Sequence, residues 1–179
     1  MAAPAAPVAK YLQAYPDEVQ QQVMELLRCG TLGQRLRGKY GGDVHGVSTD
    51  RALYDYVQAL RSEFLRGAEP LSKVRYDNKL QTVAHALGTH TTIARVQGSK
   101  LKAKREIRIA SLFRDTPAPF LKMITVHELA HLKHQEHDKA FYQLCRHMEP
   151  DYHQLEFDLR LLLTHIDAVG PLQWTAPPD

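Results

Sequence analysis

The chain has little cysteine and only a mild net charge, and each shortage excludes a class of protein. Its 179 residues include two cysteines, Cys29 and Cys145, which are too few and too far apart for a disulfide framework or a redox pair. We interpret them as two buried thiols in a protein of the reducing cytoplasm. The net charge of +3 indicates by itself no particular partner.

Long apolar runs are also missing. No run of 18 apolar residues exists, so we expect no segment to span a membrane. The first ten residues lack the charged region and apolar core of a signal peptide, and we interpret them as a tail. The composition, 44% hydrophobic and 24% charged, suits one globular domain. We expect a disordered tail over residues 1–10, a single domain over 11–172 and a second tail over 173–179.

The most informative segment that is present reads His-Glu-Leu-Ala-His and begins at His127. On a helix, residues four apart lie on one face, so His127 and His131 can direct ring nitrogens at one ion about 2.0–2.1 Å away. Glu128 is then placed to take a proton from a water molecule whose pKa the ion has lowered to about 7. The segment predicts a catalytic zinc site, with one Zn²⁺ per chain and Glu128 as general base.

A third protein ligand must come from outside this helix. His137 follows far enough behind His131 for the chain to turn and reach back. His134 competes, but on a continuing helix it would lie about 10.5 Å along the axis from His127. We expect His137 to be the third ligand, while His134, a distant carboxylate or another histidine stay as alternatives. If the helix ends near His134, that residue is a candidate for a left-handed turn.

The residues around the motif predict a buried helix. Residues 120–132 (FLKMITVHELAHL) are apolar nearly all round, and Lys122 and Lys133 mark the polar edge. Histidine and glutamate side chains inside such a helix need partners, because an unpaired buried charge is costly. A metal ion provides them. The alternative is that the histidines are ordinary core residues and that Glu128 pairs with an arginine or lysine.

The run from residue 127 to 152, HELAHLKHQEHDKAFYQLCRHMEPDY, resembles the signature of the YgjP-like metal-dependent hydrolases, which belong to the zincin metallopeptidase-like proteins. Weaker similarity extends upstream over residues 105–112. The resemblance implies that His127, His131 and His137 are the metal ligands and that Glu128 is the catalytic acid or base. It also implies either peptidase-like activity or hydrolysis of nucleoside triphosphates to pyrophosphate, since members are described in both ways.

The rest of the chain predicts helices on both sides of a small sheet. Apolar residues at helical spacing predict helices over 17–29, from a Thr49 cap to Arg66, over 138–148 and over 151–169. Residues 30–46 are rich in glycine and basic residues, and we interpret them as a flexible loop. Alternating residues over 92–96 and 105–109 predict strands in a sheet of three or four antiparallel strands. Thr116 and Pro117 mark the start of the metal-binding helix.

Lys100, Lys102 and Lys104 alternate with apolar residues, so a strand would present all three on one face together with Arg108. One interpretation is a solvated face that protects a sheet edge from aggregation. The other is contact with an anionic substrate, because the resemblance to zincins implies an edge strand along the substrate groove. Nucleotide phosphates and nucleic acid both fit that second interpretation, with weaker support for nucleic acid.

Four further side chains near the motif are open to two interpretations. His147 and His153 suit surface positions or a supporting role around the metal. Tyr142 and Tyr152 suit buried aromatic positions with a tethered hydroxyl, or donation of a hydrogen bond to an oxyanion.

Together these patterns predict an α+β, zincin-like fold in which a small antiparallel sheet packs against the metal-binding helix, with helices at both ends of the chain. We expect a zinc-dependent, metallopeptidase-like hydrolase. The alternatives are a pyrophosphohydrolase of UTP-type nucleotides, and a non-catalytic, metal-stabilised module that associates with nucleic acid. Glu128 argues against the last of these, because structural zinc needs no general base.

Overall fold

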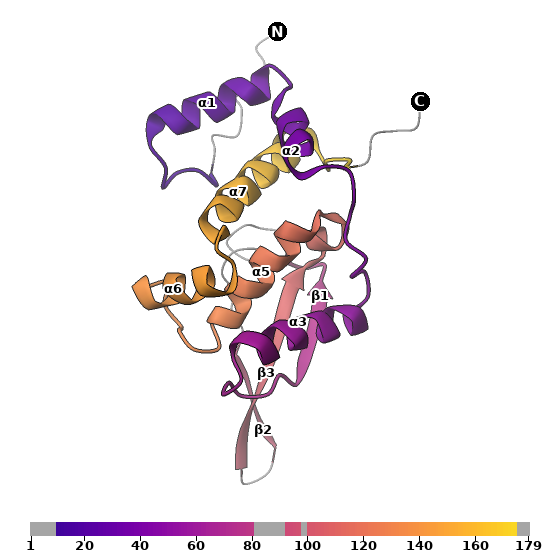
Figure 1. The fold of residues 1–179 in the computed structure, drawn as a ribbon, viewed down its shortest axis with the longest axis vertical. Coiled ribbons are helices and arrows are strands. Elements are labelled where there is room, and N and C mark those ends of the chain that lie inside the picture. Colours follow the sequence, from indigo (N-terminus) through magenta and orange to yellow (C-terminus); the bar gives the residue numbers. More distant parts are fainter. Residues whose placement is uncertain (1–9, 81–91, 98–99, 175–179) are drawn as a thin grey trace. The chain divides into compact units, whose positions relative to one another are not determined.

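The computed structural model describes residues 10–80, 92–97 and 100–174, with side chains described for 10–80 and 105–174. The chain divides into two compact units, one of residues 1–44 with 153–179 and one of residues 45–152 (Figure 1). Of the two predicted tails, residues 1–9 and 175–179 lie outside the described residues, and the domain boundaries stay a prediction. In the part of the chain that is described, no helix is long and apolar enough to cross a membrane.

The sheet lies in the unit of residues 45–152 and has the order β1-β3-β2. Its strands are β1 (Lys73–Asp77), β2 (Thr92–Gln97) and β3 (Lys100–Ala110). The first half of β3 pairs with β2, and the second half pairs with β1, beginning at the pair Lys73 and Glu106. Figure 1 shows the β2–β3 ribbon extending past the end of β1.

The α+β class is confirmed, and one detail of the sheet is corrected. β2 and β3 are antiparallel as predicted, but β1 and β3 are parallel. The chain leaves β1 at Asp77 and enters β3 at Lys100 after passing through β2, and this long connection lets it return in the same direction. The alternating pattern identified β2 and β3 but did not locate β1, and it carries no information on the relative direction of strands.

Helices α3 (Asp50–Phe64) and α5 (Ala118–Ala130) pack on this sheet and on each other. The Thr49 hydroxyl accepts a hydrogen bond from the Ala52 backbone N at 3.1 Å, which confirms the predicted cap of α3. The sheet contributes alternate residues to the core between these elements, among them Val74, Tyr76, Ile107 and Ile109. The short helix η1 (Ser111–Asp115) connects β3 to α5.

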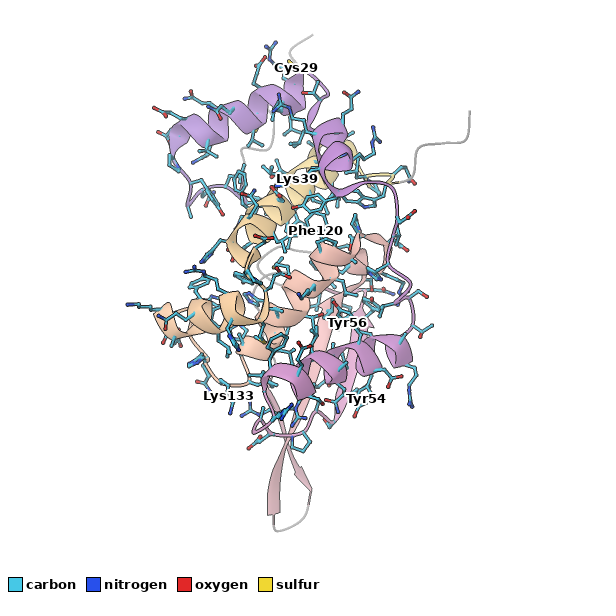
Figure 2. All side chains as sticks on the ribbon, in the orientation of Figure 1. Cys29, Lys39, Tyr54, Tyr56, Phe120 and Lys133 are labelled. Carbon is cyan, nitrogen blue, oxygen red and sulfur yellow. The ribbon has the colours of Figure 1, made fainter. Side chains whose placement is uncertain are left out.

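α5 carries the histidine motif and is buried as predicted. From Phe120 to Ala130 every residue except Lys122 is buried, and Figure 2 marks Phe120 on this helix. Pro117 stands at the N-cap. At the other end, the Arg105 guanidinium donates to the Leu132 carbonyl at 3.0 Å, which satisfies an acceptor that the helix itself leaves open. β3 therefore fixes the end of the helix at which the two motif histidines lie.

α6 (Lys139–Met148) and α7 (Tyr152–Val169) follow. Asp138 caps α6, where its carboxylate accepts from the Phe141 backbone N at 2.8 Å. Lys122 on α5 forms an ion pair with Glu149 at 2.8 Å, and Glu149 is the C-cap of α6. The segment between α6 and α7 is thereby attached to α5.

The other unit contains α1 (Asp17–Arg28), α2 (Leu32–Tyr40) and most of α7. The prediction of a loop over residues 30–46 was wrong, because α2 lies inside that range. Leu32 and Leu36 are buried one helical turn apart, so burial outweighs the low helix propensity of glycine. Gly33 is required for a close approach: a Cβ there would lie 2.8 Å from Cε1 of His165. The glycine thus reflects packing and not flexibility.

The two cysteines are both free thiols, as predicted, but only Cys145 is buried. Cys29 is exposed, which corrects that prediction, and Figure 2 shows it at the end of α1. Its sulfur donates to a Glu25 carboxylate oxygen at 3.2 Å.

Asp158 on α7 is buried, and three donors of its own unit meet its carboxylate. Lys39 Nζ lies 2.5 Å from one oxygen, and the Tyr40 hydroxyl donates to that same oxygen. The Gln154 side-chain amide donates to the other oxygen at 3.0 Å. Figure 2 marks Lys39 on α2, so this cluster fastens α2 to α7.

Candidate metal centre

His127 and His131 lie at the C-terminal end of α5, four residues apart and on one face. Their Nε2 atoms are 3.3 Å from each other, and both side chains are buried, with 3% and 4% of their surface exposed. The helical spacing therefore brings the two imidazoles together as the sequence predicts.

His137 joins this pair from the turn that precedes α6. Its Nε2 lies 3.0 Å from the His131 Nε2, and the ligand atoms of the three histidines all lie within 4.8 Å of one another. Among the described residues these three form the group that could hold a metal ion. Of the alternatives for a third ligand that lie among the described residues, His137 is the one that the fold brings to the motif.

His134 serves the site through its backbone and not through its ring. Its carbonyl oxygen accepts a hydrogen bond from Nδ1 of His131 at 3.0 Å. The suggested left-handed turn at this position was wrong, since in the described part of the chain only glycines have positive φ. His131, at the C-cap of α5, has a right-handed conformation, and the residues between it and α6 have no positive φ.

The histidine cluster fits a divalent metal ion. Nitrogens bound to one tetrahedral ion at about 2.0–2.1 Å lie about 3.3 Å apart, which is close to the two observed Nε2 separations of 3.3 and 3.0 Å. A carbonyl oxygen can only accept, so the His134 carbonyl places the proton of a neutral His131 on Nδ1 and leaves the Nε2 lone pair facing the cluster. Neutral imidazoles are ligands that zinc and similar ions prefer.

Phe141 on α6 packs against all three imidazoles. Its ring centroid lies 5.1 Å from that of His127, 4.7 Å from His131 and 4.8 Å from His137. The ring itself is fully buried. It forms an apolar wall that restricts the rotation of the imidazoles and keeps water from that side of the cluster.

The cluster reaches the surface on one side. His127 and His131 are buried, whereas His137 is exposed and His134 is half-buried. Lys133, which Figure 2 marks beyond the end of α5, is exposed as the sequence predicts. A substrate therefore has access to the cluster from the turn that carries His137.

Glu128 follows His127 on α5 and is buried, with 3% of its surface exposed. Burial raises its pKa to about 8, because the charged carboxylate loses its hydration. Within the part of the chain whose side chains are described, it has no ion pair or hydrogen bond of its carboxylate. The alternative interpretation, in which an arginine or lysine neutralises Glu128, therefore finds no support there.

The predicted substrate-contacting lysines lie on the half of β3 that pairs with β2, where Lys100 is opposite Gln97, Lys102 opposite Arg95 and Lys104 opposite Ile93. Their backbone positions confirm a strand, but their side chains lie outside the described part of the chain. Whether they approach the histidine cluster stays a prediction.

The histidines and the tyrosine considered as further candidates near the motif differ in burial. His147 and His153 are exposed, and the His147 ring packs edge-on against Phe64 at 5.7 Å. Tyr152 is fully buried, and its hydroxyl lies 2.7 Å from Nδ1 of His127. The expected tether of this hydroxyl is thus a ring of the histidine cluster itself. Sequence spacing gives no signal for that contact, nor for the role of Phe141.

Comparisons with known proteins agree with this geometry. A model of the YgjP-like metallopeptidase domain matches residues 71–161, a range that contains Glu128 and all three histidines. The UTP pyrophosphatase of Escherichia coli (strain K12) is 58% identical over 156 residues, which cover 87% of this chain and 93% of that protein. No solved structure matches the chain significantly. With more than half of the chain matched and a full-length relative of this similarity, the chain belongs to the YgjP-like family.

Proposed function

We propose that this protein is a metal-dependent hydrolase that cleaves a nucleoside triphosphate, UTP in the first place, and releases pyrophosphate. The histidine cluster supports the catalytic half of the proposal, together with the buried Glu128, which has no partner among the described side chains. The substrate is supported by the 58% identity to a UTP pyrophosphatase over nearly the whole chain.

In this proposal His127, His131 and His137 hold one divalent ion, for which Zn²⁺ is our choice because the donors are three imidazoles. When bound, such an ion polarises a phosphoryl or carbonyl oxygen and makes water more acidic. Three protein ligands leave room for a substrate or water in a tetrahedral site.

Glu128 acts as the general base that takes a proton from the attacking water. Its raised pKa of about 8 describes the carboxylate in its buried environment, and a nearby cation lowers that pKa because it favours the charged form. A carboxylate tuned in this way can accept a proton near neutral pH and return it to the leaving group.

Peptide hydrolysis is the second candidate. The matched family model is described as a metallopeptidase domain, and it covers the entire histidine cluster with Glu128. The same activated water can attack a peptide carbonyl. The two candidates differ in the substrate that the protein binds, and the 58% identity to a UTP pyrophosphatase favours the nucleotide.

The deciding experiment is a substrate screen with the full chain, stripped by a chelator and reloaded with Zn²⁺, Mn²⁺ or Mg²⁺. The four nucleoside triphosphates and a mixed peptide library are the substrates, and ³¹P NMR and mass spectrometry identify the products. A His131→Ala preparation made in parallel measures hydrolysis by contaminating enzymes.

We expect the reloaded protein to convert UTP to UMP and pyrophosphate faster than it cleaves the other nucleotides, with only background rates in His131→Ala. Peptide cleavage without nucleotide hydrolysis would establish the second candidate. Release of phosphate in place of pyrophosphate would show that the wrong phosphoanhydride bond has been proposed.

A further inference from the structure

Each buried histidine of the cluster has its second ring nitrogen held by a different kind of group. For His131 that group is the His134 carbonyl, 3.0 Å from Nδ1. For His127 it is the phenol of Tyr152, 2.7 Å from Nδ1. A carbonyl can only accept a hydrogen bond, whereas a phenol can donate or accept. The hydrogen bond that orients His131 therefore comes from the backbone, whereas the bond between Nδ1 of His127 and Tyr152 comes from a side chain.

The metal site determines the direction of the bond between His127 and Tyr152. If Nε2 of His127 is a ligand, it carries no proton, so the neutral ring must have its proton on Nδ1. Nδ1 then donates, and the Tyr152 oxygen accepts. The opposite direction, with the phenol donating to Nδ1, would put a proton on Nε2 and prevent ligation.

Tyr152 is held firmly in the position that this bond requires. It is fully buried, and its ring is nearly parallel to that of His127, with centroids 6.3 Å apart and 16° between the planes. Its backbone N donates to the Glu149 carbonyl at 3.0 Å, and the Glu149 carboxylate pairs with Lys122 on α5. Because Lys122 and His127 belong to the same helix, the turn that carries Tyr152 is attached to α5 at two places.

We propose that Tyr152 is a positioning residue of the metal site, which keeps His127 in the tautomer and orientation that present Nε2 to the ion. This inference rests on the proposal that the three histidines hold a metal, and it adds a residue to which that proposal assigned no role. Hydrogen-bond partners of this kind orient a ligand and tune its strength, and their removal typically weakens metal binding about 10- to 100-fold.

A phenol at this position also has an electrostatic consequence. A carboxylate acceptor would make His127 a stronger ligand and add a negative charge next to the ion. The neutral phenol orients the ring without that charge, so the ion keeps more of its positive potential. This arrangement suits a polyanionic substrate such as a triphosphate, which binds better where less negative charge surrounds the ion.

The test is Tyr152→Phe in the full chain, measured in two ways. Competition with a chromophoric chelator gives the Zn²⁺ dissociation constant, and we expect it to rise about 10- to 100-fold. Long-range ¹H–¹⁵N NMR of the histidine rings in the metal-free protein gives the tautomer of His127. We expect the Nδ1–H form in the parent protein and a mixture of both forms in the variant.

Tyr76→Phe is the matched control. Tyr76 is also buried, with 6% of its surface exposed, and its hydroxyl donates to the Val47 carbonyl at 2.6 Å. The control should lose thermal stability but keep the metal affinity and the His127 tautomer.

The proposal is overturned if Tyr152→Phe binds Zn²⁺ within twofold of the parent and leaves the tautomer unchanged, whatever its melting temperature. A parent protein that takes up no metal would refute the proposed metal site, while its NMR spectrum would still decide whether Tyr152 sets the tautomer. The absence of UTP hydrolysis would affect the proposed substrate alone.

Discussion

Glu128 and Asp158 are two equally buried carboxylates, each with 3% of its surface exposed, and their surroundings are opposite. Asp158 accepts hydrogen bonds from Lys39, Tyr40 and Gln154. Glu128 has no such partner among the described side chains, and desolvation alone raises its pKa to about 8.

The contrast shows how one type of side chain serves either structure or chemistry. A carboxylate surrounded by donors is stabilised as an anion, and it joins the elements that supply those donors. A buried carboxylate without partners costs stability and retains its ability to exchange a proton. Such a cost is expected at a functional site, which is why the proposed function assigns the chemistry to Glu128, for which the described side chains supply no partner.

The largest effect should come from breaking the histidine cluster itself. In His127→Ala or His131→Ala we expect metal content to fall from about one ion per chain to background, and hydrolysis to fall with it, because a lost ligand weakens binding directly. Elemental analysis of protein purified without chelator measures this. His147→Ala, at an exposed histidine of α6, is the control and should keep its metal. A His131→Ala protein with a full complement of metal would refute the site.

The next largest effect concerns Glu128. Glu128→Gln preserves the shape of the side chain but removes its basicity, so we expect kcat to fall about 10²- to 10⁴-fold with the metal retained. Stability should be unchanged or higher, because a buried group without partners has been made neutral. Steady-state kinetics and thermal unfolding of the metal-loaded protein check both points. Full activity in this variant would show that another group is the base.

Asp158→Asn should give the reverse result. The amide keeps the size of the side chain but weakens the bonds from Lys39 and Tyr40, and we expect a loss of roughly 2–3 kcal/mol in the free energy of unfolding. Metal content and kcat should stay within twofold. Urea unfolding measures the first quantity. If instead activity disappears at unchanged stability, the distinction between the two carboxylates is wrong.

The side chains of Lys100, Lys102 and Lys104 lie outside the described part of the chain, and their replacement tests whether these charges also contribute to function. If these residues contact an anionic substrate, changing all three to serine should raise KM roughly tenfold and flatten its salt dependence. Metal content should not change. If these lysines only protect a sheet edge, the kinetics will be unaffected and solubility will fall.

Nucleic acid binding is tested with the same triple variant. Affinity that falls steeply between about 50 and 200 mM salt, with a shallower slope in the variant, would support phosphate contacts. No binding at low salt would exclude this partner.

The smallest effect should come from His165, in the unit of residues 1–44 and 153–179. It extends the comparison of buried carboxylates to a buried histidine. Burial, followed by the charge of Arg37, lowers the pKa of His165. The unfolded chain therefore takes up a proton at higher pH than the folded one, so this part of the stability is complete above about pH 6.5 and is lost as the pH falls. In His165→Asn the free energy of unfolding should fall less between pH 7 and pH 5. An unchanged pH profile would contradict this origin.

Much of the site could be predicted from the sequence because its residues lie close together along the chain. The spacing of His127 and His131 on a buried helix determines their proximity, and His137 follows within reach. β2, β3 and most helices were predicted for the same reason, since periodicity reports which face of an element is buried, whereas β1 was not located.

The remaining features depend on tertiary contacts that leave no periodic signal. α2 forms in a glycine-rich segment because Leu32 and Leu36 find a core, and Gly33 is matched to His165, far away in the sequence. The parallel pairing of β1 with β3 depends on the path of the connection between them. The contact between Tyr152 and His127 depends on where the turn after α6 is attached.

The carbonyl of His134 has a consequence for how this protein tolerates mutation. Every amino acid supplies a backbone carbonyl, so the acceptor that orients His131 survives any substitution at position 134 that keeps the turn. A mutational scan should find this position permissive although it contacts a residue of the proposed metal site. The hydrogen bond to His131 can thus be retained by the backbone conformation alone. A comparison of residue identities among relatives would not detect it.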